Sequence, residues 1–558
     1  MNGRGSLALH LIAAAALLAV VPVSRPDAWA DEWGRPPSQY PSGNGRFILK
    51  VDAARGTLAL QEKGQAGTSV RWSSRYPDTG AKYGRPAPVA AYITDDGKHV
   101  VLRDIWGKVG YGKVLIFLGP NGGVLSSYTL EQLLTNHEIM KYGLSESSRW
   151  WSKRTLFFLR PGQVQFAFVT QHGTIRLFDL ATGSMLPLTP GRGRGVHSDA
   201  LTLCRKGLVS RNAEERATGA TIIGVLGDKH SVRRLKELLD DPASVRTVGP
   251  PMHPFYDVRA AAGEALTAIL GAEAAPLLEA KLSHANPQMA RKWAELLGEI
   301  GAASSSPGVR KLARSRDATT RLIAVRAMLE GDDGTVIREN AEWLRDGDQR
   351  VRWQAIRALG EHARAQDASA LRTALLDQDA NCARSALEGL VRLDPPDIEE
   401  LLHKCLRRGP HLAFGATLHL AERGDTDALR QIVLWIEALQ TGTRSGAGWG
   451  LLGVEKMCKI LVKARPAGTR SALRAASENP NTRVQCDVLG ALAALGDGGA
   501  LKRVRRFARS GGYLDRAHAI DWLGVCRDRG SLGFLREQLS DPEPIVRDAA
   551  RRALKQMQ

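Results

Sequence analysis

The apolar residues in the first third of the chain follow the period of β-strands. They alternate with polar residues or form short β-branched and aromatic runs between turn residues. The runs lie at residues 47–51, 57–60, 89–93, 99–102, 114–117, 123–125, 156–159, 164–169 and 174–178. Asp95-Asp96-Gly97 separates two of them and is a strong hairpin signal, because Asp and Gly tolerate positive φ. The pattern predicts an all-β domain over residues 31–190, with about nine or ten strands.

Further along, the apolar positions take the period of helices, and a second, longer period of 30–33 residues is superimposed on it. An Arg beside an apolar or small residue repeatedly begins a helix, at Arg216, Arg259, Arg291, Arg321, Arg352, Arg384, Arg483, Arg516 and Arg547. A two-helix hairpin of this length cannot bury both of its apolar faces alone, so about ten of them must stack. The pattern predicts an all-α solenoid over residues 210–558, with Gly360 ending one of the first helices.

The repeat has a recognisable consensus. It combines a V-R-x-x-A-x-x-A-L-G helix, as at residues 351–360, a Gly-Asp turn, as at Gly227-Asp228, and a closing L-x-D-P or L-x-D-x-D segment. These features resemble HEAT repeats, in particular the subclass first recognised in phycobilin lyases, over about residues 210–558. The resemblance implies a right-handed solenoid, in which the helix-starting Arg forms a polar ladder with the Asp of a neighbouring turn. It does not imply lyase activity, because many scaffolds share the repeat.

The β region carries a weaker resemblance. Its rhythm of strand, Asp-Gly turn, strand and Asp-x-x-x-Gly is similar to that of β-propeller blades. About 140 residues are too few for a complete propeller, so a partial propeller-like sheet and an antiparallel sandwich both remain open. Residues 187–197, rich in Pro, Gly and Arg, are predicted to be a linker, and residues 191–209 the linker together with the lead-in to the first helix.

Residues 1–30 predict a signal peptide. Arg4 precedes an apolar run broken only by His10, and the small-x-small ending Ala28-Trp29-Ala30 predicts cleavage before Asp31. An uncleaved N-terminal membrane anchor is the alternative. We therefore expect an exported chain, periplasmic or extracellular, with no transmembrane segment after cleavage.

The formal net charge of +19 is spread along the chain and favours acidic partners. Six cysteines stand singly, at positions 204, 382, 405, 458, 486 and 526. Most lie in apolar helical patterns, which predicts buried free thiols, although one or two disulfides remain open.

A search for motifs that carry chemistry yields no nucleotide-binding loop, zinc-protease helix, serine-hydrolase elbow or calcium loop. The one concentration of His and Cys is His403, Cys405, His411 and His419. Residues 403 and 405 point to different sides of a helix and Pro410 separates the two pairs, so a zinc site is not expected. We predict no catalytic residue, no cofactor site and no metal site.

Three features are candidates for partner binding. The first is basic side chains on second helices, namely Lys502, Arg505, Arg506 and Arg509, with a smaller set of Arg310, Lys311 and Arg314. Second helices usually line the concave face of such repeats, where aligned charge would meet an extended acidic partner. The second is the long inter-repeat loop of residues 244–257, with His253, Phe255 and Tyr256. The third is Trp150 and Trp151, which either contact a ligand or pack on the sheet.

The sequence thus favours an exported, non-catalytic scaffold that binds a protein. A binder of acidic polysaccharide or another anionic envelope component is one alternative, and its binding would weaken steeply with salt. Nucleic acid would bind the same charge, but export makes it a poor physiological partner. An enzyme is the other alternative, with a site in or beside the β domain near His99, Asp104 or His137.

Overall fold

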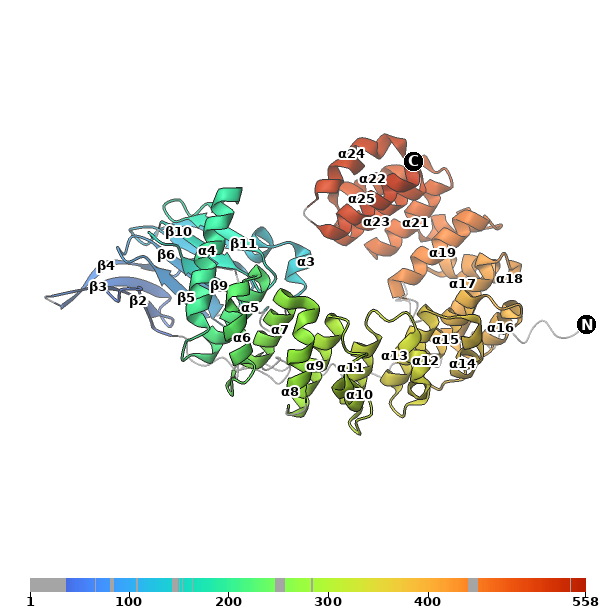
Figure 1. Cartoon of the computed structure of the whole chain (residues 1–558). Helices are drawn as coiled ribbons and strands as arrows, with labels where there is room; N and C mark the ends of the chain where they lie inside the picture. Colours follow the sequence, from blue (N-terminus) through green and yellow to red (C-terminus); the bar gives the residue numbers. More distant parts are fainter. Residues whose placement is uncertain are drawn as a thin grey trace, which may run out of the picture. The chain divides into compact units, whose positions relative to one another are not determined.

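A computed structural model describes residues 37–558 except 66, 81–84, 107–108, 143–148, 150, 153, 163, 246–255, 283–284, 440–449 and 542. The chain forms two compact units, Ser24–Ser315 and Arg316–Gln558. The unit Ser24–Ser315 contains the β-strands and the helices nearest to them in sequence. The unit Arg316–Gln558 is helical (Figure 1).

Three four-stranded antiparallel sheets make up the β region, and in each sheet neighbours in sequence pair with one another. The first sheet contains β1 (Gln39–Pro41), β2 (Phe47–Asp52), β3 (Thr57–Gly64) and β4 (Gly67–Arg75). The second contains β5 (Arg85–Ile93), β6 (Val100–Trp106), β7 (Lys113–Leu118) and β8 (Val124–Thr129). The third contains β9 (Leu156–Leu159), β10 (Gln165–Val169), β11 (Ile175–Asp179) and β12 (Met185–Leu186). A four-stranded meander is the plan of a propeller blade, so the all-β prediction is confirmed and its propeller-like alternative is favoured.

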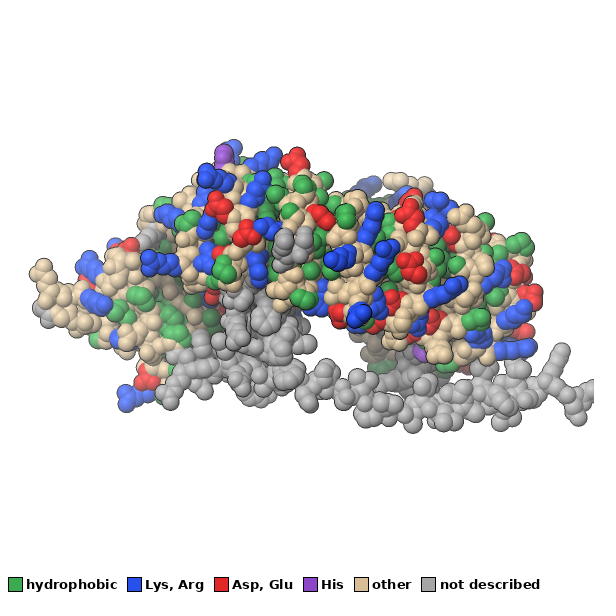
Figure 2. Space-filling view, turned by 60° about the horizontal axis from the view of Figure 1, so that its bottom comes forward, with side chains coloured by type: hydrophobic (Ala, Val, Ile, Leu, Met, Phe, Trp, Pro, Cys, Tyr) green, Lys and Arg blue, Asp and Glu red, His purple; other side chains and the backbone are tan. Residues whose placement is uncertain are grey.

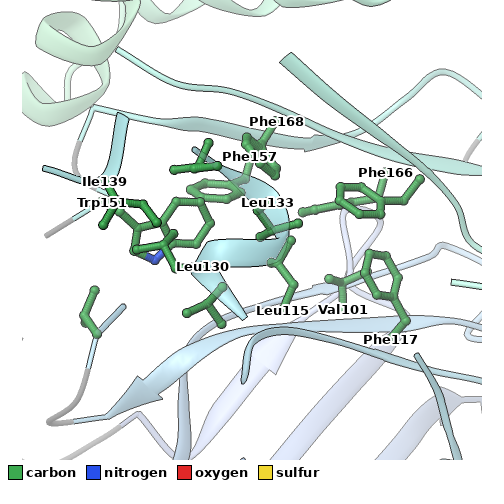
Figure 3. Packing of buried hydrophobic residues seen from close by; sticks show 14 of the residues in the cluster. Val101, Leu115, Phe117, Leu130, Leu133, Ile139, Trp151, Phe157, Phe166 and Phe168 are labelled. Atoms are coloured by element: carbon green, nitrogen blue, oxygen red, sulfur yellow. The ribbon is translucent and has the colours of Figure 1, made fainter. Parts of the chain in front are cut away.

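The second sheet lies between the other two, which explains its apolar runs. In β7, Leu115 and Phe117 face a core shared with the third sheet (Figure 3). Ile116 and Leu118 face a core shared with the first sheet. A strand buried on both faces shows no alternation between apolar and polar residues. The hairpin between β5 and β6 is confirmed by Gly97, whose φ is 70°.

The predicted linker is mostly helix. Helix α4 (Pro190–Gly207) begins at Pro190, in the N1 position where proline suits a helix. Val196, Ala200 and Cys204, spaced four residues apart, bury one face of it. The glycines at its start suggested a linker, and this buried face overrides their low helix propensity. The β region, α4 and the helices up to Ser315 belong to one compact unit.

The helical region consists of helix pairs, ten among the residues that the structure describes. The first helices are α5 (Ala213–Leu226), α7 (Val258–Leu270), α9 (Pro287–Glu299), α11 (Ala318–Leu329), α13 (Gln349–Glu361), α15 (Ala380–Leu393), α17 (Pro410–Glu422), α19 (Gly450–Ala464), α21 (Thr482–Ala494) and α23 (Tyr513–Val525), followed by a last, α25 (Pro544–Met557). The second helices are α6 (Val232–Leu238), α8 (Ala275–Leu282), α10 (Pro307–Leu312), α12 (Thr335–Glu339), α14 (Ala368–Ala374), α16 (Ile398–Cys405), α18 (Thr426–Ala438), α20 (Thr469–Ala476), α22 (Gly498–Ser510) and α24 (Leu532–Glu537).

Within the part of the chain that the structure describes, one helical stretch, Val258–Leu282, has the length and mean hydropathy, 1.2, that crossing a membrane would require. It comprises α7, a short turn and α8, and Leu266 and Leu278 within it are fully buried. Buried apolar helices of this kind are equally typical of a repeat core.

Glycine allows first helices to approach closely. Gly360 does not end α13, as predicted, but lies inside its last turn. A Cβ on Gly389 of α15 would lie 2.8 Å from the Gly360 Cα atom. The glycine of the consensus is therefore required by helix packing rather than by helix termination.

Gly389→Ala should lower the free energy of unfolding by about 1–3 kcal/mol, because the added methyl group overpacks this crossing. Gly347→Ala is the matched control in the same unit, since a Cβ there would meet no heavy atom within 4 Å. Thermal unfolding followed by circular dichroism measures both variants. Equal midpoints for the two would contradict the packing role of Gly389.

Candidate functional site

A row of Arg–Asp pairs runs along the repeats. In four of them, an Arg four residues after the N-cap of a first helix binds an Asp 25 residues further on. The pairs are Arg216–Asp241 (2.7 Å), Arg321–Asp346 (2.9 Å), Arg352–Asp377 (2.8 Å) and Arg516–Asp541 (3.0 Å). The polar ladder that the HEAT resemblance implies is thus present.

Three of the four ladder arginines, Arg216, Arg321 and Arg352, also bind the turn that precedes their own helix. Arg352 Nη1 donates to the backbone oxygen of Asp346 at 2.9 Å, and the carboxylate of Asp346 binds Arg321. Oδ1 of Asp346 further accepts the backbone N–H of Asp348, the N-cap of α13. From Arg321 to Asp377, consecutive turns are therefore joined by a chain of charge-assisted hydrogen bonds.

A second set of pairs joins a second helix to the turn inside the next repeat. Arg205 of α4 binds Asp228 at 2.8 and 2.7 Å, and Arg505 of α22 binds Asp528 at 2.8 and 2.6 Å, each 23 residues apart. Helix α4 therefore occupies the place of a second helix. The hydrogen bond from Arg205 lowers the pKa of Asp228 to about 2.

Three Arg that the sequence assigned to this row lie off it, and the first, Arg291, follows the N-cap Asn286 of α9 by five residues rather than four. Arg384 follows the N-cap Asp379 by five residues rather than four, is exposed and donates to Asn381 instead. Arg483 follows its N-cap by two residues, and Gln485 takes the ladder position and donates to the Ser477 carbonyl at 3.0 Å. The period was predicted correctly, but the phase at these helices was one or two residues out.

The predicted basic surface on α22 divides into two kinds of side chain. Val504 and Ala508 are buried, as expected, and Lys502, Arg506 and Arg509 are exposed. Arg505 is not available to a partner, because its guanidinium is held by Asp528. Arg509 lies over the Phe534 ring, 5.2 Å from the ring centroid.

The smaller basic set lies on α10 and directly after it. Arg310, Lys311 and Arg314 are exposed, and Arg310 Nε donates to the Ser304 carbonyl at 2.9 Å. The two basic sets belong to different compact units. Lys and Arg side chains are interspersed with Asp and Glu on the face drawn in Figure 2.

Trp151 cannot serve as a contact residue. Its side chain is fully buried, and its indole N–H donates to Asp104 Oδ1 at 2.9 Å. Trp150, His253 and Phe255 lie outside the described residues. Tyr256 begins β14 (Tyr256–Asp257), which pairs with β13 (Ser244–Val245) and closes the base of the predicted loop.

His99, Asp104 and His137, the candidates for an active site in the β domain, have different surroundings. Asp104 is buried, and its Oδ1 accepts the Trp151 indole N–H and the Gly110 N–H, whereas its Oδ2 has no hydrogen-bond partner. Burial raises the pKa of Asp104 and lowers that of His99. His137 lies on the exposed side of α3 (Asn136–Ile139). Nothing in the described structure groups these three residues as one site.

One cluster of possible metal ligands was not predicted from the sequence. Glu455, Asp487 and His518 stand on α19, α21 and α23, and their ligand atoms lie within 4.8 Å of one another. These three positions are separated by one repeat length each. An alignment of successive repeats would therefore have placed them at equivalent positions. Within the described residues, no such convergence includes His403, Cys405, His411 or His419. His403 pairs with Asp425, His419 pairs with Glu422 and Cys405 is buried.

Comparison with known protein families identifies one part of the helical region. Residues 307–390 match the family model of HEAT repeats. No curated protein sequence matches the chain.

Several solved structures are similar in part. One is Kap95 in the Kap95:Nup1 complex, with 12% identity and a TM-score of 0.43 over 65% of this chain and 57% of that chain. Another is yeast importin-beta, with 13% identity and a TM-score of 0.39 over 64% and 56%. A third is the CpcE–CpcF phycocyanin lyase of a Nostoc species, with 16% identity and a TM-score of 0.26 over 52% and 95%. The chain spans a little over half of the length of Kap95.

Breaking the ladder at one rung should destabilise the second unit. We expect Arg352→Met to cost about 2–4 kcal/mol, because it leaves the mostly buried Asp377 carboxylate without its partner. Arg350→Met is the control, since Arg350 is itself exposed and its ion pair is with Asp348, two residues earlier, rather than with another repeat. Hydrogen exchange of α13–α15 reports the difference, and equal exchange in both variants would show that the rung is dispensable.

The pair of Arg205 and Asp228 predicts an acid-sensitive contribution to stability. A carboxyl group whose pKa is lower in the folded state stabilises above its unfolded pKa, near 3.8, and loses this as the pH falls through about 2. Asp228→Asn should therefore lower the free energy of unfolding at pH 6 by roughly 1 kcal/mol, which thermal unfolding measures as a lower melting temperature. The difference in melting temperature between the variant and the parent chain should shrink below pH 4. A difference that stays constant down to pH 2.5 would count against this electrostatic role.

Proposed function

We propose that this chain is an exported scaffold that holds an acidic protein partner on the exposed basic surface of its helical repeats. Stacked helix repeats provide extended surfaces suited to such binding. Export rests on the sequence of residues 1–30, which lies outside the described residues.

The observation that carries the proposal is the division of the basic side chains into two sets. The ladder and inter-repeat arginines are held by carboxylates of their own chain, as Arg352 is by Asp377 and Arg505 by Asp528. In the described structure, no ion pair involves Lys502 or Arg506, and both are exposed. Basic side chains without an internal counter-ion are free to meet an acidic partner.

A protein partner and an anionic polymer would use this charge differently. A protein interface adds shape complementarity and apolar contact, so it survives salt better than a purely electrostatic contact. Salt dependence therefore distinguishes the proposed scaffold from a binder of acidic polysaccharide.

The test is affinity capture from native envelope and extracellular fractions, with the chain from Asp31 onward as bait, at low and high salt. We expect the parent chain to capture a discrete protein that stays bound at high salt. The double variant Lys502→Glu/Arg506→Glu should capture at least about tenfold less of that protein. Lys463→Glu/Lys555→Glu is the charge-matched control, because both lysines are exposed on first helices.

Equal retention by the two double variants would exclude α22 as the binding surface. Retention of polyanionic polymer alone, lost at high salt, would replace the protein-binding proposal.

A further inference from the structure

Three side chains from three successive repeats of the second unit converge on one point. Glu455, Asp487 and His518 lie on α19, α21 and α23, which pack side by side. His518 Nδ1 lies 3.6 Å from Glu455 Oε2 and 3.9 Å from Asp487 Oδ1. The chain thus gathers two carboxylates and an imidazole from residues far apart in sequence.

These atoms are poorly satisfied by the protein itself. The Asp487 side chain is fully buried, and its Oδ2 has no hydrogen-bond partner, although Oδ1 accepts the Trp522 indole N–H at 2.9 Å. His518 Nδ1 is likewise buried without a partner. Lys459 donates to Glu455 Oε1 at 2.6 Å and leaves Oε2 directed to the cluster. Buried polar atoms without a protein partner are rare, and a bound ion is one arrangement that satisfies them.

The spacing suits a small divalent cation. Zinc bonds of about 2.0–2.2 Å in a tetrahedral site place neighbouring ligand atoms about 3.3–3.6 Å apart. The two separations from His518, 3.6 and 3.9 Å, are close to that value, and all three ligand atoms lie within 4.8 Å of one another. Carboxylate and imidazole are both zinc ligands. Trp522 orients Asp487 and Lys459 orients Glu455, as outer partners do in metal sites.

The geometry points to a binding site for a divalent transition-metal ion, zinc in particular, formed by Glu455, Asp487 and His518, with a fourth position open to water. The side chains of Glu455 and His518 are 18% and 16% exposed, so an ion can enter from their side. Because each ligand comes from a different repeat, the ion clamps three first helices together.

Arg483 is the competing cation. Its Nε lies 3.7 Å from Asp487 Oδ2 and its Nη2 lies 3.8 Å from Glu455 Oε2, both beyond hydrogen-bond distance. Its Nε is also without a partner. The guanidinium therefore balances the carboxylates by charge without satisfying their lone pairs, and a bound ion would displace it.

Isothermal titration of the folded, chelator-treated chain with Zn²⁺ tests the site. We work at pH 7.5, because burial raises the pKa of Asp487 to about 7 and zinc binds the deprotonated carboxylate. We expect one tight site, weakened at least tenfold in Glu455→Gln and in His518→Ala. Arg483→Gln should bind more tightly than the parent chain. Hydrogen exchange of α19–α23 should slow when zinc is present.

The matched control is His419→Ala, because His419 is equally buried and pairs with a carboxylate on a single helix. It should leave zinc binding unchanged. If His518→Ala fails to fold, the zinc affinity of Glu455→Gln tests the site by itself. The Glu455 side chain is partly exposed, so we expect this variant to fold. Absence of zinc binding, or equal binding by the parent chain and Glu455→Gln, would show that the cluster is an internal ion-pair network and overturn the proposal.

Discussion

The pairing of a first-helix Arg with an Asp 25 residues away is the interaction on which the helical architecture depends. The bond between Arg352 and Asp377 ties the start of a repeat to the turn that leads into the next one. The same Arg holds the preceding turn through the Asp346 carbonyl. Both partners are mostly shielded from water, so the loss of either leaves a charge that the protein cannot solvate.

This constraint sorts the basic residues by role. An Arg at the ladder position, or at the Arg205 and Arg505 positions, is occupied within the chain. Basic side chains at other phases of the same helices, such as Lys502 and Arg506, face solvent. A net charge of +19 is consequently a poor measure of the charge available to partners, because many arginines are paired internally.

Much of this fold can be predicted from the sequence, because its signals are local or periodic. Alternation along β2 and the turn at Asp96-Gly97 identified the strands, and the repeat length identified the helix pairs. The layering of the sheets could not be predicted, since a doubly buried strand such as β7 lacks alternation. The glycines near Pro190 suggested a linker because their helix depends on tertiary burial.

The candidate sites were less predictable, because their parts meet only in three dimensions. The exposure of Lys502 and Arg506 followed from helical periodicity, whereas the capture of Arg505 by Asp528 required the neighbouring repeat. Glu455, Asp487 and His518 each look ordinary within their own helix. Only alignment of successive repeats in register would have brought them together before the structure did.

We propose that internally paired arginines build the scaffold and that the unpaired basic residues bind the partner. Hydrogen exchange of the full chain, with and without its captured partner, tests this most directly. We expect binding to slow exchange most strongly in α22 and to leave α13–α15 unchanged. Protection confined to the β strands, with α22 unaffected, would contradict it.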